Sequence, residues 1–115
     1  HEAHDAARQA LVDVDAVPAH VLWETYSVLT RMPPPHRVAA EVASAALSAL
    51  PFDTLTFSGD VRDVLQECAA GSIVGGAAYD ALVAATARTH SRMLLTRDRR
   101  AQRTYDALGV AHRFI

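Results

Sequence analysis

The chain contains no lysine: its eleven permanently cationic side chains are all arginine. Mechanisms that need a lysine amine, such as the phosphate contact of a P-loop, are therefore excluded. The single cysteine, Cys68, allows neither an internal disulfide nor a thiolate zinc site, so a reducing, cytoplasmic setting is the simplest interpretation. No run of eighteen apolar residues and no signal peptide is visible, so we expect no membrane span. The formal net charge of −2 excludes an overall basic field that would attract nucleic acid.

Hydrophobic residues make up 50% of the 115 positions, which is enough for one domain with its own core, and we expect residues 1–115 to form it. Stretches of helical and strand periodicity alternate along the chain. The predicted helices are residues 3–13, 19–31, 36–50, 59–70 (capped by Ser58 and ended by Gly71), 77–90 and 99–108, and the predicted strands are 16–17, 53–57, 92–96 and a stretch within 110–115. This alternation predicts an α/β fold, a parallel sheet with helices on both faces.

The stretch RMLLTRD, residues 92–98, places a hydroxyl and a carboxylate at the end of a buried strand. In open α/β sheets the carboxyl ends of the strands face the crevice where ligands bind, so Thr96 and Asp98 are candidate site residues. Asp98 also has a structural interpretation, as the N-cap of the helix that follows. A carboxylate at a helix start in such a crevice could cap the helix and also bind a metal ion.

Two further carboxylates could reach the same edge of the sheet. Asp80 lies in the first turn of helix 77–90, where a negative charge is favourable against the helix dipole, but alanines surround it, which favours a close approach of other elements. Glu24 shares a polar stripe of helix 19–31, which is typical of a solvated face, although its helix begins directly after strand 16–17. Three converging carboxylates would repel one another unless a cation lay between them. Hard oxygen ligands select Mg²⁺ or Mn²⁺, which can activate water for attack on a phosphodiester.

The stretches VLWETYSVLTRMP, GGAAYDALVAATAR and LLTRDRRA, with YDALGV behind them, resemble the PIN-domain ribonucleases. More narrowly, they resemble the VapC toxins of bacterial toxin–antitoxin modules, and the likeness covers nearly the whole chain. It implies a parallel-sheet α/β fold, an acidic pocket for Mg²⁺ or Mn²⁺, cleavage of RNA, inhibition by a VapB-like antitoxin, and a homodimer. It also implies that Glu24, Asp80 and Asp98 bind the metal and that Thr96 helps to order the site.

The family begins with a strand that carries a first aspartate, and no such strand is visible between residues 1 and 115. The chain starts at HEAHDAARQAL without a methionine, so we expect it to lack upstream residues, including that central strand. A truncated chain of this kind could be catalytically inactive, and the alternative function is a module that binds an antitoxin or associates with its own copy. Exposed Leu, Trp and Tyr side chains of helix 19–31 would serve such a contact.

Arginines crowd the last third of the chain, and three of them, Arg97, Arg99 and Arg100, flank the predicted site. The planar guanidinium suits phosphate, so we expect these three to contact the substrate. A solvated helix face or ion pairs with acidic side chains would explain the crowding equally well. A phosphotransfer receiver domain, the other enzyme class with acidic residues at strand ends, needs a lysine that this chain lacks.

Overall fold

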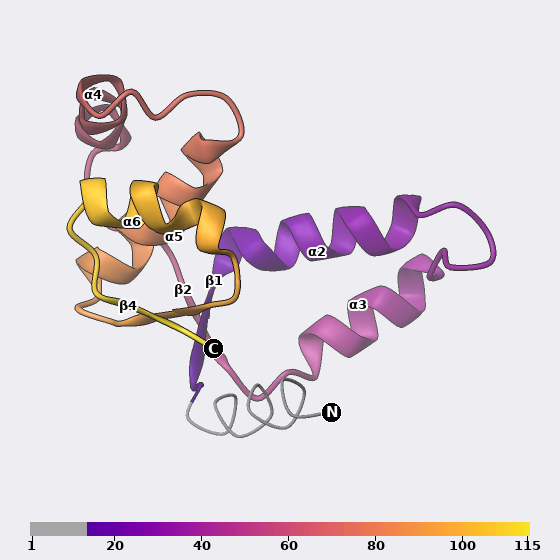
Figure 1. Ribbon diagram of the computed structural model, residues 1–115. Coiled ribbons are helices and arrows are strands. Elements are labelled where there is room, and N and C mark those ends of the chain that lie inside the picture. The colour runs from indigo at the N-terminus through magenta and orange to yellow at the C-terminus, as the bar shows by residue number, and fades with distance from the viewer. Residues whose placement is uncertain (1–13) are drawn as a thin grey trace. The chain divides into compact units, whose positions relative to one another are not determined.

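The computed structural model describes residues 14–115, which divide into two compact units (Figure 1). One unit is Asp15–Thr56, and the other contains Val14 and Phe57–Ile115. The predicted helix at residues 3–13 lies outside the described residues, and the single domain over residues 1–115 stays a prediction. None of the helices within residues 14–115 combines the length and the apolar character that crossing a membrane requires.

The unit Asp15–Thr56 contains β1 (Ala16–Pro18), α2 (Ala19–Arg31), α3 (Ala40–Ser48) and β2 (Asp53–Leu55). Strand β1 pairs in parallel with β2, and α2 packs against α3. Helix α2 has the predicted bounds because Pro18 ends the strand before it and the MPPP stretch follows it.

The predicted helix over residues 36–50 is four residues too long at its start and two at its end. Residues 36–39 are not helical, and one of their backbone N–H groups bonds back to the preceding helix instead. The backbone N–H of Val38 donates to the carbonyl of Leu29 in the last turn of α2, at 2.9 Å. Arg37 Nε donates to the carbonyl of Met32 at 2.9 Å, and Ala39 is extended (φ −61°, ψ 143°) directly before α3 begins.

The second unit contains α4 (Val61–Ala70), α5 (Ala77–Thr89), β3 (Leu94–Thr96), the 3-10 turn η1 (Arg99–Ala101), α6 (Gln102–Ala107) and β4 (His112–Phe114). Its core centres on α5, where Ala81, Ala84 and Ala85 are completely buried. Because these side chains are only methyl groups, α4 and α6 can both pack closely against α5. Tyr105 and Leu108, near the end of α6, complete this core.

The α/β class predicted from the sequence is confirmed, since strands alternate with helices and both strand pairs are parallel. Strand β3 pairs with β4 with Thr96 opposite Phe114. The predicted Ser58 cap is wrong: the chain is extended at Asp60, whose carboxylate accepts the N–H of Arg62 at 2.9 Å. Gly59 lies between the two candidates at φ 136°, a conformation that carries the chain past Ser58 before the helix begins.

Candidate active site

Strand β3 delivers Thr96 and Asp98 to one end of the β3–β4 pair, as the RMLLTRD stretch predicts. The backbone N–H of Asp98 donates to Thr96 Oγ1 at 3.1 Å, so the threonine hydroxyl shapes the turn that follows the strand. Asp98 Oδ1 accepts the N–H of Arg100 at 3.0 Å and thereby caps η1. Its side chain is 45% exposed. The carboxylate therefore acts as a helix cap and still faces solvent, so the structural interpretation does not exclude a functional one.

Tyr105 joins these residues, although the sequence did not single it out. It is only 5% exposed, and its phenol forms a hydrogen bond with the Thr96 side chain. Burial raises the pKa of the Tyr105 phenol, the Thr96 hydrogen bond lowers it, and the negative charges of Asp80 and Asp98 raise it further. The net direction is upward, so the phenol keeps its proton. Two carboxylates that are eighteen positions apart in the chain thus act on the same phenol.

Asp80 lies in the first turn of α5, as predicted, and is half-buried. Its position follows from the packing of α5, because the alanine face fixes this helix against α4 and α6. The helix-dipole interpretation of Asp80 holds for its place in the first turn. The negative charge of Asp80 also raises the pKa of Tyr105, whose phenol is hydrogen-bonded to Thr96 at the end of β3.

Glu24 belongs to the other unit, on α2, and its side chain is 56% exposed. Glu24 Oε1 lies 3.8 Å from His20 Nε2, one helical turn earlier. That nitrogen is buried and has no hydrogen-bond partner within the described part of the chain. The sharing of one cation by Glu24, Asp80 and Asp98 stays a prediction.

The donor set around Tyr105 has the chemistry of a hard-cation site. The Asp80 and Asp98 carboxylates and the Thr96 hydroxyl offer only oxygen, which suits Mg²⁺ or Mn²⁺ better than zinc. Within residues 14–115, no three His, Cys, Asp or Glu side chains gather closely enough to hold a metal ion. The residues described in the second unit thus fit a divalent cation in the chemical kind of their donor atoms.

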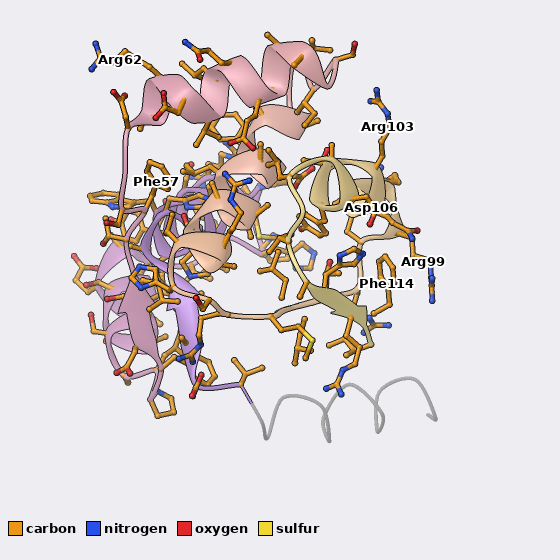
Figure 2. The ribbon with its side chains drawn as sticks, turned by 90° about the vertical axis from the view of Figure 1, so that its left-hand side faces the viewer. Phe57, Arg62, Arg99, Arg103, Asp106 and Phe114 are labelled. Carbon is orange, nitrogen blue, oxygen red and sulfur yellow. The ribbon has the colours of Figure 1, made fainter. Side chains whose placement is uncertain are left out.

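The three arginines predicted to contact substrate all follow β3 and are exposed. The guanidinium of Arg99 lies over the Phe114 ring, 4.4 Å from its centroid, and Figure 2 shows the two side chains beside each other. Arg100 Nε lies 3.3 Å from Asp98 Oδ1 and its side chain is 94% exposed, so this ion pair is a weak surface contact. Substrate contact by Arg97, Arg99 and Arg100 stays a prediction.

Other arginines of the crowded last third have structural roles. Arg88 forms a bidentate pair with Glu67 on α4, with Nη1–Oε1 at 2.9 Å and Nη2–Oε2 at 2.7 Å. Its Nη1 also donates to the carbonyl of Leu108, at the end of α6. Arg103 donates to the carbonyl of Gly71. Ion pairing with acidic residues, the alternative interpretation of the crowding, is therefore correct for Arg88.

The signal that could have identified Tyr105 is its place in the stripe Ala101, Tyr105 and Leu108 of the last helical stretch. All three side chains are buried, and only Tyr105 among them carries a polar tip. A buried tyrosine hydroxyl usually finds a hydrogen-bond partner, and in this unit that partner is the hydroxyl at the end of β3.

Comparison with known proteins agrees with the family resemblance seen in the sequence. The family model described as "PIN domain" matches residues 1–107. Ribonuclease VapC40 of Mycobacterium tuberculosis (strain CDC 1551 / Oshkosh) is 45% identical over 116 residues, which cover 96% of this chain and 84% of that protein. Ribonuclease VapC27 of Mycobacterium tuberculosis (strain ATCC 25618 / H37Rv) is 44% identical over 96 residues, covering 83% of this chain and 70% of that protein. No solved structure matches.

Proposed function

This chain belongs to the PIN-domain family as a VapC-type ribonuclease, and we propose that it hydrolyses RNA internally with a divalent metal ion, Mg²⁺ or Mn²⁺, held by Asp80, Asp98 and Glu24. The observation that carries the proposal is that two carboxylates from separate elements lie within electrostatic range of one buried residue. Asp80 on α5 and Asp98 after β3 both act electrostatically on the buried phenol of Tyr105. Carboxylate oxygens of this kind are the ligands that a hard divalent cation prefers, which supports a metal site that includes both.

The bound cation would lower the pKa of a coordinated water and offset the charge that develops on the attacked phosphate. Two hydrogen bonds within the chain hold Asp98 in place for that role. Thr96 Oγ1 accepts the Asp98 N–H and so fixes the turn that carries the carboxylate. The Arg100 N–H holds Asp98 Oδ1 and limits its rotation. The exposed guanidinium groups of Arg97, Arg99 and Arg100 would bind the phosphates on either side of the scissile bond.

We further propose that the chain is the toxin of a toxin–antitoxin pair, that it works in the cytoplasm as a homodimer, and that a VapB-like antitoxin inhibits it. The support is its membership of the VapC-type ribonucleases. RNA cleavage without control would harm the host cell, so a protein inhibitor is the expected counterpart.

A second candidate function is a catalytically inactive module that binds an antitoxin or a second copy of itself. One observation favours it: an open groove of about 370 Å³ lies between α2 and α3, within the unit Asp15–Thr56. Apolar and aromatic side chains line much of it, including Leu22, Tyr26 and Trp23, which is 76% exposed. Exposed aromatic surface of this kind is typical of protein contacts.

Metal-dependent cleavage separates the two functions. We expect the chain to cut single-stranded RNA with Mg²⁺ or Mn²⁺ and to stop when EDTA removes the metal. Asp80→Asn keeps the side-chain volume but removes the charge, and we expect at least a roughly 100-fold loss of activity. Asp63→Asn is the matched control, since Asp63 is an exposed aspartate in the first turn of α4, and its activity should match the wild type. Cleavage that survives EDTA or Asp80→Asn would contradict the proposed mechanism.

A further inference from the structure

We propose that the hydroxyl of Tyr105 is a positioning group of this active site, which holds the Thr96 hydroxyl and, through it, the turn that carries the Asp98 carboxylate. The inference rests on the proposed function and adds to it a residue whose side chain is uncharged at neutral pH. Tyr105 acts through its neighbours and is therefore a positioning residue and not a catalytic one.

The hydrogen bonds of Thr96 support this role. Thr96 Oγ1 already accepts the Asp98 N–H at 3.1 Å and is also hydrogen-bonded to Tyr105. The Thr96 side chain therefore contacts both the Asp98 backbone and the buried phenol. The chain of hydrogen bonds then runs from the Asp98 backbone through the Thr96 hydroxyl to the Tyr105 phenol. The Thr96 hydroxyl thereby links the turn after β3 to a buried residue of α6.

The Tyr105 ring is held firmly enough to position its neighbours. The side chain is 5% exposed, and the imidazole of His112 packs against it at a ring-centroid distance of 5.5 Å. The carbonyl of Tyr105 accepts the Val110 N–H at 3.1 Å, which closes the end of α6 over the same residue. The ring therefore has one environment, and its hydroxyl arrives at a fixed place without further loss of rotamer freedom.

The hydroxyl and the ring can be separated experimentally. The packing of Tyr105 against Leu108, Val110 and the α5 alanines is apolar and needs only the ring. Burying a phenol oxygen in such a core is unfavourable unless a hydrogen bond compensates, so the core alone gives no reason for a hydroxyl here. Tyr105→Phe keeps the ring and removes only the group to which we assign the function.

Kinetics and metal binding give the first test. With a labelled single-stranded RNA that the wild type cleaves, we expect Tyr105→Phe to lower kcat about 10-fold and to leave KM nearly unchanged. Calorimetric titration should show Mn²⁺ binding weakened by a similar factor. Tyr79→Phe is the control, because Tyr79 is 64% exposed on α5, and it should behave as the wild type does. Full kcat and unchanged Mn²⁺ affinity in Tyr105→Phe would overturn the inference.

Hydrogen exchange in the metal-free protein gives a test that needs no activity. If the Tyr105 hydroxyl fixes Thr96, its removal should free the Asp98 amide, and we expect that amide to exchange about 10-fold faster in Tyr105→Phe. Thr96→Val should show the same increase, and Thr96→Ser should restore the wild-type rate. An Asp98 amide that Tyr105→Phe leaves unchanged would overturn the inference. A wild type that neither binds Mn²⁺ nor cuts RNA would overturn the proposed function itself, and the positioning role with it.

Discussion

The bidentate pair of Arg88 and Glu67 ties three helices of the second unit together, and its removal should measurably weaken the fold. Arg88 links α5 to α4 through two short bonds to Glu67 and to the end of α6 through the Leu108 carbonyl, at 2.7 Å. The two side chains are 33% and 41% exposed, so solvent screens the pair, and we assign it about 1 kcal/mol. The hydrogen bond to the Leu108 carbonyl contributes about 1 kcal/mol more. Arg88→Met, which keeps the aliphatic packing, should therefore lower the free energy of unfolding by about 2 kcal/mol.

Urea denaturation at pH 7, followed by far-ultraviolet circular dichroism, measures this change. Glu67→Gln should be destabilised by about 1 kcal/mol, and the double variant should show a coupling energy of about 1 kcal/mol. Arg62→Gln is the matched control, since Arg62 is 84% exposed and pairs with Asp60, two residues earlier in the chain, so no comparable loss is expected. A loss below about 0.5 kcal/mol in Arg88→Met would refute the assignment of a structural role.

The same pair predicts a dependence on pH. The Arg88 hydrogen bonds lower the pKa of Glu67 from its ordinary value of 4.5. A carboxyl group whose pKa is lower in the folded state stabilises the fold above its unfolded pKa and loses that contribution as the pH falls through its folded pKa. The coupling between Arg88 and Glu67 should therefore be constant from pH 7 to pH 5 and disappear below pH 4.5. A coupling that stays constant into strong acid would contradict the ionic nature of the pair.

Two further predictions concern substrate contact and packing. Arg97→Gln with Arg99→Gln should reduce the slope of log affinity for single-stranded RNA against log salt by about 1.4, because two phosphate contacts are lost, and an unchanged slope would refute those contacts. Ala84→Leu, at a completely buried position of α5, should lower the unfolding free energy by about 2 kcal/mol in thermal or urea denaturation. The exposed Ala69→Leu on α4 should leave it unchanged.

The helix ends that the sequence predicted well are those marked by a nearby proline or glycine. Pro18 and the MPPP stretch bound α2, and Gly71 follows α4, so both bounds of α2 and the end of α4 were predicted correctly. The start of α3 was missed because a bond from Val38 to Leu29, in the preceding helix, decides it. The Ser58 cap was wrong because two capping residues lie close together, and only the backbone at Gly59 selects Asp60.

The candidate site was predictable in part for a related reason. Thr96, Asp98 and Asp80 carry visible chemistry at strand or helix ends, and the structure relates all three to one phenol. Tyr105 was not predicted because it belongs to an apolar stripe of its helix. The hydrogen-bond partner of its hydroxyl, Thr96, lies nine residues earlier on another element. The Arg88–Glu67 pair spans 21 residues, and no periodic pattern connects two such positions.

The alanine face of α5 has a consequence for the precision of the chemistry. A helix that meets its neighbours through methyl groups has no flexible side chains to absorb a displacement, so its first turn, and with it the Asp80 carboxylate, can move only if the whole helix moves. The position of the Asp80 carboxylate is then determined by alanines, which carry no functional group. Enlarging one of them should impair cleavage at a distance, and more than the accompanying loss of stability would explain.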